Sequence, residues 1–315
     1  MTRAGRFCPA GYGYAPAAFA GASEIEAETL YVVGGLYGNG FALDAVQDMA
    51  AAERGPVSIV FNGDFNWFNI RPDSFAAINA RVLRHTALRG NVETELAGDD
   101  RGAGCGCAYP ETVSDAEVAR SNRILDMLRD TARDFPDLRA QLAGLPMLAS
   151  ARVGGLRIGI VHGDAESLAG WRFAQQSLDA PDNLPWLDAV HAAAGVDLFA
   201  SSHTCLPALR EFALSRGSLV VINNGAAGLP NFSGTRYGLL TRISTGPAPI
   251  TPVYGVRRGG VHVDALPIHY DHARWIEAFL SDWPSGSPAH DSYYRRISEG
   301  PGYGAEIARP GLIAA

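Results

Sequence analysis

The sequence contains no lysine, and all 26 of its basic residues are arginine. Without lysine, neither Schiff-base catalysis nor phosphate binding by a P-loop lysine is open to this protein. Apolar runs long enough to cross a membrane are also missing. Glycine and proline interrupt residues 1–22, which therefore make a poor signal peptide. We expect a protein of the cytoplasm with no membrane partner.

Disulfide-forming cysteine and net positive charge are lacking as well. The four cysteines are too few for a disulfide framework in a chain of 315 residues. A formal charge of −7 gives no electrostatic reason to expect a nucleic-acid partner. The chain is instead rich in apolar residues, at 47%, with 19% charged residues, as in ordinary globular enzymes.

The sequence shows no internal repeat and no linker that would divide it. We expect a single domain over residues 1–315, with an irregular N-terminal segment at 1–28 and a loop-like C-terminal tail at 282–315.

Strands and helices alternate in the first half of the chain. Apolar, β-rich runs predict strands at 30–34, 57–61 and 86–88, with amphipathic helices at 41–54 and 73–85 between them. This alternation predicts parallel strands whose functional groups lie at their C-terminal ends.

The second half is mostly β-structure. Ser114 and Glu117 form a capping box for a helix at 115–133. Gly154-Gly155 predicts a hairpin between strands at 147–152 and 156–161. A further pattern predicts helices at 184–194 and 270–280, and strands at 196–200, 210–215, 218–223, 238–243, 252–257 and 261–266.

Five polar clusters follow predicted strands. They are GGLYGN at 34–39, FNGD at 61–64, RGNVE at 89–93, VHGD at 161–164 and SSHTCLP at 201–207. Each cluster alone is a weak signal. Five of them in order, each at a strand end, indicate one shared site.

The order of these clusters resembles the calcineurin-like metallophosphoesterase superfamily, whose motifs run D-x-H, G-D, G-N-H-[DE], G-H and G-H-x-H. The resemblance covers about residues 30 to 230 and includes VINNGAAGLP at 221–230. It implies an α/β fold, a four-layer α/β/β/α sandwich of two mixed sheets flanked by helices. In the family, two metal ions bridged by an aspartate and a hydroxide hydrolyse a phosphoester.

The resemblance carries one half of the family's metal ligands onto this chain. The bridging aspartate falls on Asp64, the asparagine on Asn91, and two histidines on His162 and His203. Two imidazoles with two oxygen donors suit Zn, Mn or Fe. The resemblance thus implies one bound ion, with a second ion as the alternative.

The other half departs from the family pattern. The D and H of D-x-H fall on Gly35 and Tyr37, and the last histidine of G-H-x-H falls on Cys205. The histidine of G-N-H, which contacts the substrate phosphate in the family, falls on Val92, while Glu93 keeps the acidic position after it. Loss of one ion would remove several kcal/mol of transition-state stabilisation, so two-metal hydrolysis does not follow from the resemblance.

The cysteines and Tyr37 leave alternatives open. Cys205, with Cys105 or Cys107 and with Asp64, would rebuild a thiolate site for the second metal. Alternatively, the three cysteines are structural thiols. Tyr37 is either a phenolate ligand or a side chain that fills the space of the lost metal.

Three further features are candidates for substrate contact. Trp67 follows the G-D motif, where it would line the cleft or pack in the core. Arg89 precedes the G-N turn, where it would meet a phosphate or solvent. The segment HDSYYRRI at 290–297 would fold over an anionic ligand, serve a dimer contact, or form an ordinary surface.

Two functions remain open at this point. The first is a metal-dependent hydrolase, a phosphatase or phosphodiesterase, acting on a small phosphorylated substrate through an atypical or mononuclear metal site. The alternative is a catalytically inactive binding or scaffold protein that retains the fold. Self-association is compatible with either function.

Overall fold

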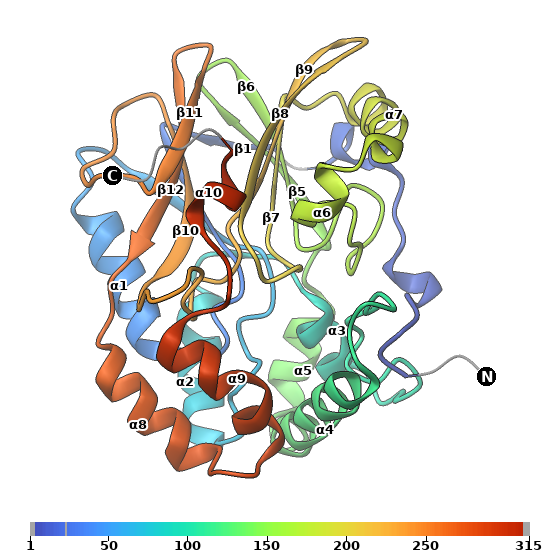
Figure 1. Cartoon of the computed structure of the whole chain (residues 1–315), viewed down its shortest axis with the longest axis vertical. Coiled ribbons are helices and arrows are strands. Elements are labelled where there is room, and N and C mark those ends of the chain that lie inside the picture. The colour runs from blue at the N-terminus through green and yellow to red at the C-terminus, as the bar shows by residue number, and fades with distance from the viewer. Residues whose placement is uncertain (1–3, 23, 311–315) are drawn as a thin grey trace.

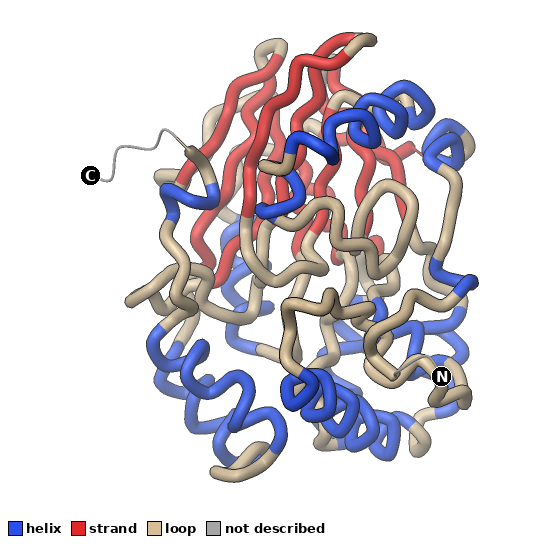
Figure 2. The backbone as a smooth tube through the Cα atoms, turned by 45° about the vertical axis from the view of Figure 1, so that its right-hand side comes forward, coloured by secondary structure: helices blue, strands red, loops and turns tan. Residues whose placement is uncertain are grey.

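The computed structural model describes residues 4–22 and 24–310. Two mixed sheets of six strands each pack face to face, with helices outside them (Figures 1 and 2). The first sheet has the order β1 (Glu24–Ala27), β5 (Leu148–Val153), β6 (Leu156–Val161), β7 (Leu198–Ser201), β9 (Gly217–Asn223) and β8 (Ala208–Leu214). The second has the order β11 (Tyr254–Arg258), β12 (Val261–Ile268), β10 (Gly238–Ser244), β2 (Thr29–Val33), β3 (Val57–Phe61) and β4 (Thr86–Ala87). The predicted four-layer α/β/β/α fold is confirmed.

Side chains that point alternately to the two faces of each strand connect the sheets and the helices into layers. On β2, Leu30 and Val32 face the first sheet, where they join a core cluster with Ile158 and Ile160 of β6. Tyr31, between them in the sequence, belongs to the cluster under the helices of the second sheet. Because successive side chains point to opposite faces, one buried strand serves both layers.

Helices cover both outer faces. The second sheet is covered by α1 (Gly40–Ala51), α2 (Pro72–Val82), α3 (Asn91–Ala97), α4 (Asp115–Ala132), α5 (Pro136–Ala143), α8 (His272–Asp282) and α9 (Pro288–Glu299). The first sheet is covered by the 3-10 helix η2 (Pro16–Ala20), α6 (Gln175–Leu178) and α7 (Leu184–Ala194). Short turns of helix occur at η1 (Ala10–Tyr12), η3 (Pro181–Asn183) and α10 (Ala305–Ala308). Among the helices of residues 4–22 and 24–310, none has the length and apolar character of a membrane span.

Parallel strands direct their ends to a common edge. In the second sheet β2, β3 and β4 run parallel, with Val33 opposite Phe61. In the first sheet β6, β7 and β9 run parallel, with Ile160 opposite Ala200. Four of the five polar clusters follow β2, β3, β6 and β7, and the fifth follows β4, as predicted. The predicted hairpin is also confirmed, since β5 and β6 pair antiparallel on either side of Gly154-Gly155.

The prediction of a loop-like tail from residue 282 is wrong for most of its length. Ser287 caps the N-terminus of α9 by accepting a hydrogen bond from the backbone of His290, and Pro288 occupies the first turn. Ala289 and Ile297 bury one face of this helix. A capped amphipathic helix therefore covers part of the second sheet where the sequence predicted a loop.

Two more elements depart from the sequence predictions. The segment 1–28 is not irregular throughout, because β1 pairs in parallel with β5, where Glu24 forms ion pairs with Arg152 and Arg157. The turn predicted at 89–91 leads directly into α3, which begins at Asn91. The assignment of a single domain stays a prediction, and its residues 1–3, 23 and 311–315 lie outside the described part of the chain.

Candidate metal centre

Four side chains from separate segments converge at the edge where the parallel strands end. Asp64 follows β3, Asn91 begins α3, His162 follows β6 and His203 follows β7. From Nε2 of His162, Oδ1 of Asn91 lies at 3.1 Å, Nδ1 of His203 at 3.1 Å and Oδ2 of Asp64 at 3.3 Å. All four residues are at least nine-tenths buried. Residues more than a hundred positions apart thus share one point.

Backbone carbonyl groups fix the orientation of both imidazoles. Nδ1 of His162 donates to the carbonyl oxygen of Asn62 at 2.9 Å. Nε2 of His203 donates to the carbonyl oxygen of Cys107 at 3.0 Å. Each ring therefore turns its other nitrogen, with its lone pair, toward the shared point. Metal-binding histidines are usually held in this way by a hydrogen bond on the far side of the ring.

Hydrogen bonds also orient the two oxygen donors, Asn91 and Asp64. The amide nitrogen of Asn91 donates to the carbonyl oxygen of Cys105 at 2.9 Å, which turns Oδ1 toward His162. The backbone N–H of Val92 donates to Oδ1 of Asp64 at 3.1 Å. This leaves Oδ2 of Asp64 facing His162.

Glu93 holds the loop that carries Asp64. Its carboxylate accepts the backbone N–H groups of Asp64 at 2.7 Å, Gly90 at 3.0 Å and Phe65 at 3.0 Å. The Glu93 side chain is fully buried, and burial together with the charge of Asp64 raises its pKa to about 7. Glu93 is therefore a positioning residue that acts through the backbone of the Asp64 loop.

Gly90 allows the two loops to approach each other. A Cβ at this position would lie 2.3 Å from Oδ1 of Asp64 and 2.7 Å from its backbone nitrogen. Any residue with a Cβ would therefore force Asp64 away from His162, because the Asp64 backbone and its hydrogen-bonded carboxylate have no room to move aside.

The charges at this point favour a cation. Burial works against the ionised form of Asp64, but His162 outweighs burial and lowers the pKa of Asp64. Burial would lower the pKa of His162, yet Asp64 raises it. For His203, burial and the charge of His162 lower the pKa to about 3. Asp64 therefore keeps the ionised form that a metal ligand needs.

A single metal ion fits this donor set. Atoms bound to one ion at about 2.0–2.2 Å are roughly 3.0–3.6 Å from one another, and the distances around Nε2 of His162 are 3.1–3.3 Å. Within residues 4–22 and 24–310, one group of three or more His, Cys, Asp or Glu ligand atoms within 4.8 Å is found, and it is Asp64, His162 and His203. Asn91 adds a fourth donor.

Two solved structures share this architecture along most of the chain. A hypothetical protein from Pyrococcus horikoshii OT3 aligns with a TM-score of 0.57 and 14% identity, covering 87% of this chain and 99% of its own. A metallophosphoesterase from Sphaerobacter thermophilus aligns with a TM-score of 0.52 and 16% identity, covering 87% of this chain and 100% of its own. The chain has the metallophosphoesterase fold. No protein-family model and no curated protein sequence matches it.

The half of the site that departs from the metallophosphoesterase motifs is filled by Tyr37. A Cβ on Gly35 would lie 3.1–3.2 Å from atoms of the Tyr37 ring, including its hydroxyl oxygen. The phenol thus occupies the space in which a side chain at position 35 would begin. The Tyr37 hydroxyl lies 2.9 Å from the Cys205 thiol, so these two side chains form a hydrogen bond with each other.

The cysteines do not assemble into a second ligand cluster in the described residues. The Cys107 thiol contacts the carbonyl oxygen of Cys105 and the amide of Asn91 at 3.6 Å. Burial raises the pKa of both Cys107 and Cys205, which favours the neutral thiol. The loop 105–107 does reach the site. It contributes the carbonyl groups that orient Asn91 and His203, and the rebuilt thiolate site remains a hypothesis without supporting geometry.

A small pocket of about 30 Å³ opens beside the four donors. Besides Tyr37 and Cys205, its walls include Trp67 and Tyr293, which the sequence analysis considered for ligand contact, and two aromatic residues that it did not assign to the site, Tyr109 and Trp171. Tyr293 comes from the segment 290–297, which the sequence analysis had considered for contact with an anionic ligand.

Arg89 and Val92 lie outside this pocket wall. The guanidinium of Arg89 donates to the carbonyl oxygen of Ala143, away from the donors. The Val92 side chain belongs to the hydrophobic core under α3, so it cannot act in place of an imidazole. Contact between Arg89 and a substrate phosphate stays a prediction.

Backbone strain is concentrated at the centre. Among the described residues, four residues other than glycine have positive φ: Tyr37 at 54°, Asp64 at 54°, Ala108 at 48° and Cys205 at 61°. Three of them line the pocket and the fourth follows Cys107. Residues in this conformation persist where the surrounding structure holds them, and they cluster at functional sites.

Proposed function

We propose that this protein is a metal-dependent hydrolase of small phosphoesters that works with one ion. The observation that carries the proposal is the convergence of Asp64, Asn91, His162 and His203, with three ligand-to-ligand distances of 3.1–3.3 Å. The fold shared with a metallophosphoesterase supports the same reading. Zn, Mn and Fe suit two imidazole nitrogens and two oxygens.

The chain's own residues would hold the ion and shape its surroundings. When bound, such an ion lowers the pKa of water and polarises a phosphoryl oxygen. The carbonyl groups of Asn62 and Cys107 keep His162 and His203 in place. Aromatic side chains line the pocket beside the donors, and electrostatic interactions are stronger next to such apolar groups than in water.

The substitution at Val92 bears on the substrate. No imidazole stands at this position to assist the leaving group, and the Val92 side chain is buried in the core. Phosphoesters whose leaving group departs without a proton, such as aryl esters, would therefore be hydrolysed fastest.

The test is turnover of p-nitrophenyl phosphate and bis(p-nitrophenyl) phosphate by the full chain loaded in turn with Zn, Mn and Fe. We expect turnover with at least one metal and its loss on chelation. Absence of turnover with every metal would overturn the proposal.

A non-catalytic binding protein is the second candidate, and the small size of the pocket favours it. A volume of about 30 Å³ is close to that of one water molecule, so a phosphoryl group could enter only if a wall moved. Protein that purifies without metal, and whose melting temperature does not change on chelation, would support this candidate.

The filling of the lost half by Tyr37 predicts the metal stoichiometry. We expect about one ion per chain in the wild type, and the same value in Cys205→Ala, because the thiol is not a ligand. The triple variant Gly35→Asp, Tyr37→His, Cys205→His should bind about two ions, since it removes the phenol and restores three ligands. Elemental analysis after dialysis measures this. Two ions in the wild type, falling to one in Cys205→Ala, would contradict the account.

A further inference from the structure

A tight loop at residues 164–172 folds around the buried side chain of Asp164. Gly170 permits this packing, since a Cβ on it would lie 1.9 Å from Oδ2 of Asp164. The carboxylate accepts three backbone N–H groups of the loop, those of Glu166 at 3.0 Å, Ser167 at 3.1 Å and Arg172 at 3.1 Å. These bonds reach both the start and the end of the loop, so a single side chain fixes its shape.

The loop brings Trp171 to the metal centre. Its indole N–H donates at 3.0 Å to the carbonyl oxygen of Cys107, which also accepts the Nε2–H of His203 at 3.0 Å. A carbonyl oxygen has two lone pairs, so it serves both donors at once. The rings of Trp171 and His203 also meet edge to face, with their centroids 5.3 Å apart. Trp171 is thus joined to His203 both through one oxygen atom and by direct packing.

The Cys107 carbonyl lies in a strained part of the chain. Ala108, the next residue, has a φ of 48°, and residues other than glycine keep this conformation only where neighbouring groups hold it. Ala108 packs against a small apolar cluster that includes Leu168 and Ala169 of the loop 164–172. The loop therefore holds the peptide group between Cys107 and Ala108 by packing as well as by the indole hydrogen bond.

We propose that Trp171, set in place by Asp164, is a positioning residue for His203. By holding the Cys107 carbonyl, the indole keeps the proton of His203 on Nε2 and turns the lone pair of Nδ1 toward His162. The hydrogen bond on the far side of a histidine ring fixes its tautomer and its orientation as a metal ligand. The consequence for metal binding rests on the proposed function, whereas the tautomer is a property of the metal-free chain.

The first test compares the wild type with Trp171→Phe, which keeps an aromatic ring beside His203 and removes the indole N–H. Long-range proton–nitrogen NMR on metal-free protein with isotope-labelled histidine reports which ring nitrogen carries the proton. The signals of His203 are those missing from a His203→Gln variant. We expect the Nε2–H tautomer alone in the wild type and a mixture of both tautomers in Trp171→Phe.

Zinc affinity, measured by competition with a chromophoric chelator, is the second readout. We expect Trp171→Phe to bind zinc about tenfold more weakly, because loss of a group that orients a ligand typically weakens a metal site by about 10- to 100-fold. Asp164→Asn keeps the size of the side chain and lies outside the pocket wall. It should weaken zinc binding in the same direction, since its amide group would meet an N–H that the carboxylate accepts.

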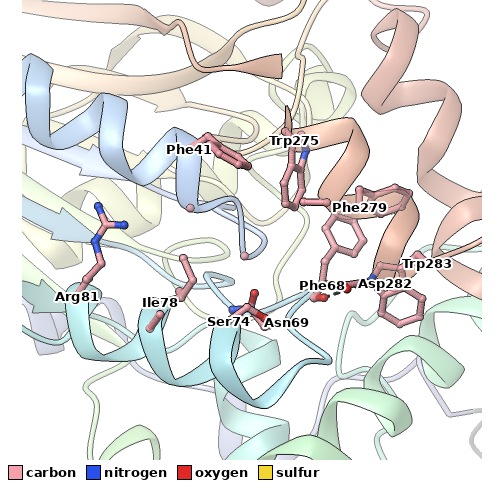
Figure 3. A pocket seen from close by; sticks show the side chains of 14 residues that line it. Phe41, Phe68, Asn69, Ser74, Ile78, Arg81, Trp275, Phe279, Asp282 and Trp283 are labelled. Atoms are coloured by element: carbon pink, nitrogen blue, oxygen red, sulfur yellow. Dashed lines mark hydrogen bonds between the residues drawn. The ribbon is translucent and has the colours of Figure 1, made fainter. Parts of the chain in front are cut away.

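Trp283→Phe is the matched control. Trp283 lies in the groove between α1, α2 and α8, shown in Figure 3, and its indole N–H also donates to a backbone carbonyl, that of Phe68, at 3.2 Å. Because Trp283 is fully buried, this variant should lose stability. It should nevertheless keep the His203 tautomer and the zinc affinity of the wild type.

A folded Trp171→Phe protein that keeps the single Nε2–H tautomer of His203 and binds zinc as the wild type does would overturn the proposal. Equal changes in Trp283→Phe would overturn it as well, since they would trace the effect to lost stability. A wild type that binds no zinc would count against the proposed hydrolase instead, and the tautomer comparison on metal-free protein would still decide the role of Trp171.

Discussion

We expect turnover of an aryl phosphoester to fall by about a thousandfold or more when His162 is replaced by alanine, and metal binding to weaken with it. The reason is that His162 lies at the middle of the donor set. Its Nε2 is within 3.3 Å of Asn91, His203 and Asp64, and its removal leaves these three without their common neighbour. The measurements are steady-state kinetics and elemental analysis of the same preparations.

His269→Ala serves as the matched control for this loss. His269 is exposed and lies outside the pocket wall, so the variant should keep wild-type turnover and metal content. A His162→Ala protein that remains folded, binds its metal and turns over normally would exclude the proposed centre.

The largest loss of stability is expected for Arg242→Ala. Arg242 is almost fully buried on β10, where it binds both oxygens of Glu53, at 2.6 Å and 3.0 Å. It also lies 3.4 Å from Asp264, and Tyr31 donates to Glu53 at 2.8 Å. Removing the guanidinium leaves two buried carboxylates unpaired, which costs about 3–5 kcal/mol of unfolding free energy. Urea unfolding followed by circular dichroism measures this.

The pH dependence of this effect has a definite sign. Burial would raise the pKa of Glu53, but its hydrogen bond to Arg242 lowers it. The stabilisation is therefore present above the ordinary carboxyl pKa and is lost as the pH falls through the lowered value. The difference between wild type and Arg242→Ala should shrink toward about pH 4, where the carboxylates protonate.

Arg295→Ala removes an exposed arginine that pairs with Glu299 and should leave stability unchanged within error. An Arg242→Ala variant as stable as this control at neutral pH would mean that the buried network contributes nothing.

The strand ends were the predictable part of this molecule. Buried strands such as β3 are short apolar runs, and the polar residues after them, Asp64 among them, must lie at the sheet edge. Because neighbouring parallel strands bring their C-terminal ends together, His162 after β6 and His203 after β7 are expected to be neighbours. Asp64 follows β3 of the other sheet, and its place beside them was implied by the resemblance to the metallophosphoesterase motifs. The four-layer fold was likewise implied by that resemblance.

The surroundings of the donors were not predictable in this way. The sequence suggested thiolate ligands at Cys105 and Cys107, yet the site uses their carbonyl groups on Asn91 and His203. The direction of a loop carbonyl depends on φ and ψ, which no local pattern specifies there. Glu93 likewise acts through three backbone N–H groups that only tertiary folding brings within reach.

The helical form of the segment that carries Tyr293 was missed for a different reason. Ser287 and Pro288 form a recognisable helix start, but the polar and aromatic residues after them hide the apolar face. Tyr293 reaches the pocket because α9 packs against α4 and α8, contacts between distant segments that the local sequence does not report.

Anomalous diffraction from crystals grown with zinc would locate the metal directly. The account predicts one strong peak per chain, within bonding distance of Oδ2 of Asp64, Oδ1 of Asn91, Nε2 of His162 and Nδ1 of His203. A peak beside Tyr37 and Cys205, or no peak among these four atoms, would contradict it.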